Sequence, residues 1–375
     1  MHILGRRSTH ASHLERWLGT EQSESISAQF KDWYGPPVAV AGVPGNVFVR
    51  GGGDFVGNIN AGRFTSMAEV HYDRIKRASK MLAREAALTH GVGFSSLSDM
   101  ISKWTQSNNG QQLWFNKSST VTPAAGRAAT IWYSAGQPGA GAAGAAAPGG
   151  TANAKGDAGS YPVINTTTGS EGLFLVSGFG GNQQVGGNIL LYDRLFSVAK
   201  TMSSTTSEAV TGVPTRYQST TSSDWEYAGG NFMVPEVTSA LSATAHNWNV
   251  MQYTDQDGNT AISAPSNTGV SSAGQYTVDL AVGNWFSSLA AGDIGVKAIS
   301  SMQCSASVTG GVTWTIGHPL ALIPVWGANN FSPADFTNSA FGVVRMYDTA
   351  CLAMMWLGYS TTAAQPSLQL NLLRG

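Results

Sequence analysis

The sequence predicts an α+β protein in which a helical and mixed N-terminal region precedes an antiparallel β-sandwich of jelly-roll type. Capping boxes open helical patterns near the N-terminus, a Gly/Ala/Pro-rich stretch follows, and short β-branched and aromatic runs fill the second half. The expected divisions are 1–105 for a helical and mixed arm, 106–165 for a Gly/Ala/Pro-rich loop or linker region, and 166–375 for the β-sandwich domain.

The arm is expected to hold three helices and one set of short strands joined by tight turns. These are helices over 12–18, 26–34 and 66–90, and strands within 38–61. Two of the helices begin with capping boxes, Ser12-x-x-Glu15 and Ser66-x-x-Glu69. The glycine triplet 51–53 separates the strands, and no Gly-Lys-Ser/Thr follows it, so a tight turn is favoured over a phosphate-binding loop.

The second half contains runs of the residue types that favour strands. They are Leu173–Val176, Ile189–Phe196, Phe232–Leu241, Trp248–Tyr253, Tyr276–Leu280, Val296–Val308, Val312–Val325, Val343–Met346, Cys351–Leu357 and Leu368–Leu373. Asp257-Gly258 and Gly310-Gly311 lie between such runs and are typical of hairpin turns. No Gly-Lys-Ser/Thr follows the glycines of 178–181 either, so a tight turn between strands is favoured there over a phosphate-binding loop. Many short strands with polar turns predict a sandwich or jelly roll.

Charged residues are scarce: 21 Lys and Arg and 22 Asp and Glu make up only 11% of 375 residues, with a net charge of −1. Soluble domains are usually about a quarter charged. This composition produces no general attraction to nucleic acid or to an anionic membrane. We therefore expect much of the surface to be covered by copies of the chain or by other proteins.

Tryptophan is abundant in the second half of the chain. The residues considered are Trp225, Trp248, Trp285, Trp314, Trp326 and Trp356. Anchoring in the core or at an interface is favoured, because Trp buries a large area with few torsions to restrict. Stacking platforms for carbohydrate are the alternative.

Catalytic and metal-binding patterns are weak. No Gly-x-Ser-x-Gly motif occurs, and the seven histidines show no recognisable spacing to Ser and Asp, so no enzyme is expected. His10 and His13 share a helical spacing but lack a third metal ligand. The acidic stretch 255–259 resembles the start of a calcium loop. Thr260 and Ser266 stand where such a loop requires Gly and Glu, so a hairpin turn is favoured. No cofactor and no metal are expected.

The two cysteines, Cys304 and Cys351, are expected to be free buried thiols. The N-terminus lacks the apolar core of a signal peptide, and no apolar run reaches the length of a membrane span. The sequence therefore predicts synthesis in a cytoplasm and no membrane partner.

Candidate interaction residues lie in the arm. They are Trp17, Trp33, Arg74, Arg77, Lys80 and Arg84. Helix 66–90 has a local basic bias, which favours the solvated or partner-facing side of a structural helix. Nonspecific contact with packaged DNA through the phosphates is the alternative.

Three stretches resemble virion structural proteins of tailed bacteriophages. They are NILLYDRL at 188–195, AAGDIGVKAISSMQCSAS at 290–307 and YDTACLAMMWL at 347–357. The resemblance implies a non-enzymatic component of the virion, attached to the capsid or the neck and assembled with copies of itself and other virion proteins. A tail-associated receptor or glycan-binding module is the alternative function, and a hydrolase acting on the cell wall is a third class.

Overall fold

The computed structural model describes residues 46–51, 53–58, 93–117, 126–166, 171–202, 206–227, 230–336, 343–358, 361–362 and 364–375. The chain divides into two compact units, Met1–Ser79 and Lys80–Gly375. In the first unit, β1 (Asn46–Gly51) and β2 (Gly53–Asn58) form an antiparallel hairpin in which Gly51 is opposite Gly53. This pairing confirms the tight turn predicted at the glycine triplet. The three helices predicted in the arm lie outside the described residues.

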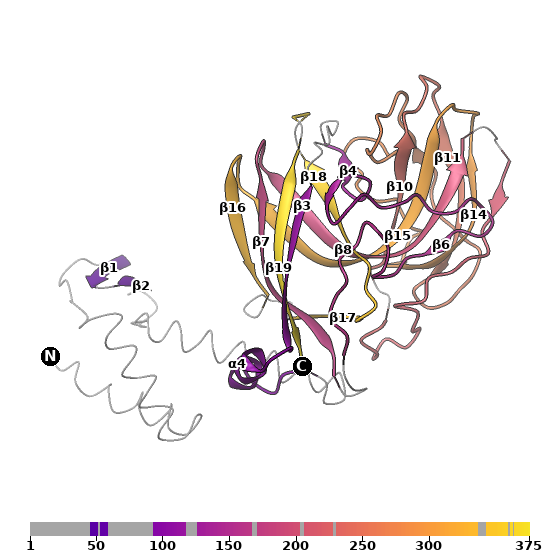
Figure 1. Cartoon of the computed structure of the whole chain (residues 1–375). Helices are drawn as coiled ribbons and strands as arrows, with labels where there is room; N and C mark the ends of the chain where they lie inside the picture. The colour runs from indigo at the N-terminus through magenta and orange to yellow at the C-terminus, as the bar shows by residue number, and fades with distance from the viewer. Residues whose placement is uncertain are drawn as a thin grey trace. The chain divides into compact units, whose positions relative to one another are not determined.

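The second unit is built from antiparallel sheets and helix α4 (Leu97–Thr105) (Figure 1). The β8 sheet has the order β10 (Phe232–Ser239), β15 (Gly311–Val325), β8 (Gly187–Thr201), β18 (Leu352–Gly358) and β4 (Ala128–Thr130), with β6 (Thr151–Ala152) paired to β8. The β7 sheet has the order β16 (Asn330–Asp335), β7 (Leu173–Asn182), β19 (Pro366–Arg374), β3 (Gly110–Lys117) and β5 (Gly136–Gln137), with β17 (Val344–Met346) paired to β7. The β11 sheet has the order β12 (Ile262–Ser263), β11 (Asn247–Asp255), β14 (Val296–Cys304) and β9 (Glu208–Ala209), with β13 (Asn267–Thr268) paired to β11.

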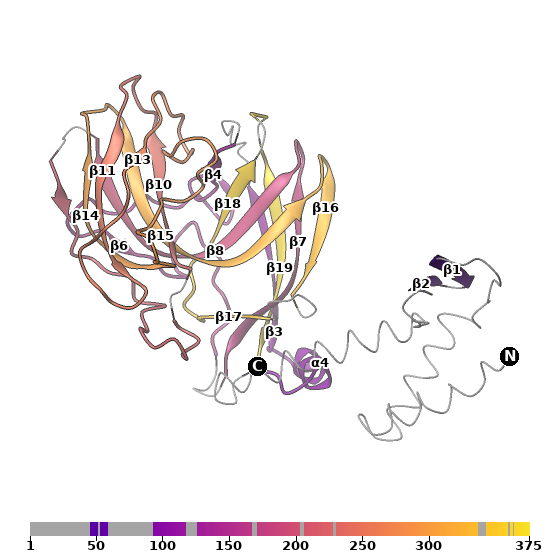
Figure 2. The ribbon, with the colours of Figure 1, turned by 180° about the vertical axis from the view of Figure 1, so that it is seen from behind.

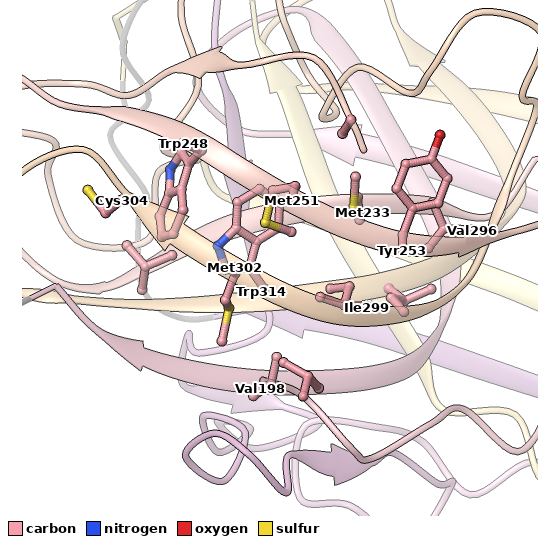
Figure 3. Packing of buried hydrophobic residues seen from close by; sticks show 14 of the residues in the cluster. Val198, Met233, Trp248, Met251, Tyr253, Val296, Ile299, Met302, Cys304 and Trp314 are labelled. Atoms are coloured by element: carbon pink, nitrogen blue, oxygen red, sulfur yellow. The ribbon is translucent and has the colours of Figure 1, made fainter. Parts of the chain in front are cut away.

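The long strands β8 and β15 are shared by two cores. Toward one end, Ile189 and Ile323 pack with Leu370 of the β7 sheet. Toward the other end, Val198 and Trp314 pack with residues of β11 and β14, as Figure 3 shows. The register between β8 and β15 shifts twice between these ends, and such bulges bend a sheet. Figures 1 and 2 show the two groups of strands on either side of this bend. The expected antiparallel, sandwich-like architecture is therefore present.

Almost every run predicted as a strand contains one. The exception is Tyr276–Leu280, which makes only isolated bridges, one to Ala129 and one to Glu236. The predicted turn at Asp257-Gly258 is confirmed, because it connects the antiparallel strands β11 and β12, and Gly258 has a φ of 89°.

Two glycine predictions are wrong. Gly310-Gly311 is not a hairpin turn, because β14 and β15 belong to different sheets. Gly178–Gly181 lies inside β7 rather than in a turn. A Cβ at Gly180 would lie 2.7 Å from Cγ2 of Ile323, so the glycine allows the β7 and β8 sheets to approach closely.

The segment 106–165, predicted as a loop or linker, is part of the β body. It contributes β3, β4, β5 and β6. Its residues 134–160 are named here the Gly/Ala strap, which pairs with β3 at 136–137 and runs along β8 at 145–152. Ala199 donates to the carbonyl of Ala145 and accepts from the amide of Ala147. Because β18 pairs β8 only over 187–193, the strap covers the edge of β8 beyond it. Small side chains allow this close contact of backbones.

Lys117 fixes the start of the strap. Its side chain is 2% exposed, and Nζ donates to the carbonyl oxygens of Ser134, Pro138 and Gly139 at 3.1, 2.9 and 3.0 Å. Burial lowers the pKa of Lys117 to about 8, but three acceptors favour the ammonium form. The buried lysine is therefore a structural clamp between β3 and the strap.

Candidate interaction surface

Most of the Lys and Arg side chains described from residue 93 onward are buried. Over the described residues from 93 onward, none of the Lys and Arg side chains is exposed. Those that are buried are Lys117, Arg194, Lys200, Arg216, Lys297 and Arg374, and those that are half-buried are Lys103, Arg127, Lys155 and Arg345. Among Asp and Glu over the same residues, those exposed are Asp224, Asp257 and Asp335. The part of this unit that the structure describes from residue 93 onward therefore has no fully exposed cation and few fully exposed carboxylates.

Arg194 and Glu236 form a fully buried ion pair. Arg194 Nη2 lies 2.7 Å from Glu236 Oε2, and Nη1 donates to Oε1 at 2.9 Å. Thr315 and Tyr133 donate their hydroxyls to Oε2 at 2.8 and 3.1 Å. The guanidinium also lies 4.8 Å from the ring centroid of Trp132. Since both carboxylate oxygens are bonded, this cluster offers no free acid or base.

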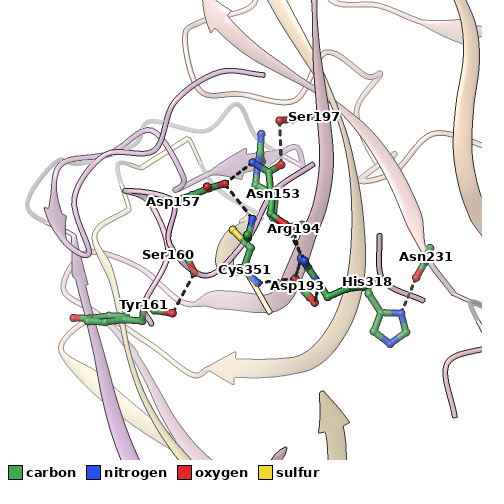
Figure 4. A network of polar contacts seen from close by, with 12 residues as sticks. Asn153, Asp157, Ser160, Tyr161, Asp193, Arg194, Ser197, Asn231, His318 and Cys351 are labelled. Atoms are coloured by element: carbon green, nitrogen blue, oxygen red, sulfur yellow. Dashed lines mark hydrogen bonds and ion pairs between the residues drawn. The ribbon is translucent and has the colours of Figure 1, made fainter. Parts of the chain in front are cut away.

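A second buried pair joins Asp193 and Arg216. Figure 4 shows Asp193 in the surrounding polar network, together with Cys351. Arg216 donates to both carboxylate oxygens, at 2.9 and 2.7 Å, and the amide of Cys351 donates to Oδ1 at 2.8 Å. Burial raises the pKa of Asp193 even though Arg216 opposes the rise. Burial also raises the pKa of Cys351 to about 12. Cys351 and Cys304 are free and buried, which confirms the prediction, and the Cys351 thiol stays protonated at neutral pH.

The third buried group is His246 with Asp279. His246 Nε2 lies 2.9 Å from Asp279 Oδ2, and Nδ1 lies 3.1 Å from the carbonyl oxygen of Thr244. Trp248 Nε1 donates to the same Asp279 oxygen. Burial lowers the pKa of His246, but the hydrogen bond and charge of Asp279 outweigh it, so the pKa is raised. Both ring nitrogens face acceptors, so the imidazolium form fits and no nitrogen is free to act as a base.

His318 is half-buried as a neutral ring. Its Nδ1 donates to Asn231 Oδ1 at 2.7 Å, and the ring stacks on Tyr217 with centroids 3.8 Å apart. Burial lowers the pKa of His318 to about 4. At a pH above the ordinary histidine pKa of 6.5, the ring is neutral in both the folded and the unfolded chain, so His318 does not make stability depend on pH there.

Acid is expected to destabilise the protein through His318. Between pH 6.5 and pH 4 the unfolded chain binds a proton that the folded chain does not, so the free energy of unfolding falls as pH falls through this window. With allowance for the partial exposure of the ring, we expect a loss of about 2 kcal/mol. Urea unfolding of the wild type and of His318→Gln at both ends of the window measures it. Equal pH dependence of the two proteins would contradict the assignment.

The β7 sheet has an open face that points away from the β8 sheet. Leu113, Phe115 and Leu370 point into the core, so the alternate residues of the same strands point outward. We name these outward residues the amide–aromatic face: Gln112, Trp114 and Asn116 of β3, Ser367, Gln369 and Asn371 of β19, Ser177 and Phe179 of β7, and Phe331 of β16. Trp114, Phe179 and Phe331 are 51%, 39% and 56% exposed.

The amides of this face are connected across strands. Gln112 Nε2 donates to Asn371 Oδ1 at 3.3 Å, and Asn371 Nδ2 donates to Ser177 Oγ at 2.9 Å. Gln112, Asn371 and Ser177 lie side by side on neighbouring strands and form one row of the face. In the next row, Gln369 of β19 lies between Trp114 of β3 and Phe179 of β7. The face therefore combines exposed rings with side-chain amides of restricted orientation.

The predicted interaction residues of the arm, Trp17, Trp33, Arg74, Arg77, Lys80 and Arg84, lie outside the described residues. Of the tryptophans considered above, Trp248, Trp314 and Trp356 are fully buried, which confirms core anchoring for these three, whereas Trp326 is 77% exposed. Trp114 is not among the residues predicted from the sequence. The signal was the alternation of polar and apolar residues over 110–117, inside the segment assigned to a linker.

The acidic stretch at 255 forms a turn. Asp255 Oδ1 accepts from the amides of Asp257 and Asn259, both at 2.9 Å. No group of three or more His, Cys, Asp or Glu that would hold a metal occurs among the described residues. In the same part of the chain, no helix has the length and apolar character needed to span a membrane.

These features define a sandwich-like β protein in which no Lys or Arg side chain described from residue 93 onward is fully exposed. Comparison with protein-family models, curated proteins and solved structures finds no match to the chain.

Proposed function

We propose that this protein is a non-enzymatic structural component of a tailed-phage particle, which assembles with copies of itself and with capsid or neck proteins in the virion. The observation that supports assembly is that, among the described residues from 93 onward, no Lys or Arg side chain is fully exposed, and of the Asp and Glu side chains only Asp224, Asp257 and Asp335 are. Surfaces with few charges associate readily, and the centres of protein interfaces are depleted of charged residues. The phage setting rests on the resemblance of the three stretches at 188–195, 290–307 and 347–357.

The buried acids and bases support the absence of catalysis. Glu236, Asp193 and His246 are each bonded to partners inside the fold. A repeating sandwich of jelly-roll type would stabilise a symmetric shell by burying apolar and backbone-polar surface between copies.

Sedimentation velocity of the full chain tests the assembly. We expect a species larger than the 39.2 kDa monomer that persists in molar NaCl, because contacts without ion pairs are not screened by salt. Three single variants, Val282→Lys, Ile294→Lys and Leu322→Lys, replace apolar side chains that are 64%, 57% and 53% exposed. A lysine that falls within a contact between subunits is expected to weaken the assembly. A monomer in both salt conditions that also fails to cosediment with purified phage particles would remove the proposal.

A further inference from the structure

We propose that the amide–aromatic face of the β7 sheet binds a neutral oligosaccharide or polysaccharide. The sugar rings would stack on Trp114 and Phe179, and their hydroxyls would bond to Gln112, Gln369 and Asn371. This binding goes beyond the assembly function and does not depend on it.

The spacing of the aromatic rings suits a chain of sugars. Trp114 of β3 and Phe179 of β7 are both opposite Gln369 of β19, so two strand spacings, about 10 Å, separate them. This distance is comparable to a disaccharide unit. The apolar face of a sugar ring packs on an aromatic ring, as other apolar groups do, so two alternate sugars of one chain would each find a platform. Gln369 would contact the sugar between them.

The amide row supplies hydrogen bonds in set directions. The bonds from Gln112 to Asn371 and from Asn371 to Ser177 hold these side chains in place. Each amide has two N–H donors and one carbonyl acceptor, so bonding capacity remains for hydroxyl groups. Ordering these side chains in advance reduces the entropy lost when a ligand binds.

The charge of the face indicates a neutral ligand. The row of Trp114, Gln369 and Phe179 ends at Pro333 and contains no ionised side chain. The amide row meets one carboxylate, Asp335 of β16, at the edge of the sheet. An acidic or basic polymer would therefore find no array of countercharges on this face.

The size of the face argues against a second copy of the chain as the occupant. Four strands and three rows of side chains span about 15 Å by 14 Å, on the order of 200 to 300 Å². A stable protein interface buries about 800 Å² on each partner. A flat area of this size is instead sufficient for three or four sugar units.

Binding of cellohexaose, maltohexaose and chitohexaose to the full chain tests the proposal, by calorimetry and by the fluorescence of the exposed Trp114. We expect at least one hexasaccharide to bind with an affinity that salt does not change. Trp114→Ala is expected to weaken that binding about tenfold, which corresponds to the loss of one aromatic stacking contact. Gln369→Ala is expected to weaken it by a smaller factor. Trp104→Ala is the matched control, because Trp104 is 42% exposed on α4 and lies outside the face.

Unfolding curves show whether each variant is folded, and sedimentation shows whether its assembly is changed. Wild-type protein that binds none of the hexasaccharides and is not retained by cellulose, amylose or chitin would overturn the proposal. Equal binding by wild type and a folded Trp114→Ala would also overturn it. Loss of assembly in Trp114→Ala without any glycan binding would instead assign the face to a contact between copies. A protein that fails to assemble but binds a glycan through Trp114 would leave this inference standing.

Discussion

Replacement of Glu236 by glutamine is expected to lower the free energy of unfolding by about 3 to 5 kcal/mol, because it leaves the guanidinium of Arg194 charged and without its counterion in the core. Both side chains are fully buried. Glutamine keeps the shape of glutamate and one carbonyl acceptor, so the loss would come from the charge rather than from packing. Urea unfolding of the variant measures it.

The matched control is the double variant Arg194→Met with Glu236→Leu. Removing both charges eliminates the penalty of an unpaired buried ion, and such replacements are often neutral or stabilising. The double variant is therefore expected to be more stable than Glu236→Gln alone. The intact pair that Asp193 of the same strand β8 forms with Arg216 provides a second comparison. A Glu236→Gln protein as stable as the wild type would show that solvent reaches Arg194.

Alanine at Gly144 is expected to destabilise the protein by about 3 kcal/mol, at the upper end of the usual range for overpacking. A Cβ there would lie 2.4 Å from the carbonyl carbon and oxygen of Ser197 on β8. Backbone atoms cannot rotate away, so the strap would have to leave the edge of β8. That movement would break the hydrogen bonds of Ala145 and Ala147 with Ala199.

Gly156 is the control within the same strap. A Cβ at Gly156 meets nothing within 4 Å, so Gly156→Ala is expected to change stability by less than about 0.5 kcal/mol. Urea unfolding compares the two variants, and limited proteolysis reports whether residues 134–160 have become accessible. If Gly144→Ala and Gly156→Ala behaved alike, the strap would not be packed against β8 as the structure describes.

The strands that the sequence predicts all contain buried apolar residues on at least one face, although β3, where Leu113 and Phe115 are buried, has such a face and was missed. Residues 189–196 and 312–325 are examples, and both lie in the long strands shared by the two cores. The Asp257-Gly258 turn was also recognisable, because its glycine adopts a positive φ and its acidic neighbour bonds to the backbone locally. These features depend on residues close to one another in the chain.

The Gly/Ala strap shows why local patterns fail elsewhere. Its composition resembles a flexible linker, because Gly and Ala have little side chain to bury. In the fold the same small residues allow its backbone to lie against β8, and the large groups that complete the packing, such as Trp132 and Phe196, come from other segments. A Cβ at Gly141 would lie 2.0 Å from the Trp132 ring. No pattern within 134–160 contains that information.

The sequence by itself determined the β-rich character of the second half and the scarcity of charge, because composition and short-range alternation carry these properties. Only the tertiary structure decided where the charges lie. Arg194 and Glu236 are far apart in the chain and meet across β8, β15 and β10, whereas Trp114 and Phe179 become neighbours in one row through β19. Strand pairing between distant segments selects which residues share a face, and that selection places the ions inside and the amides and rings outside.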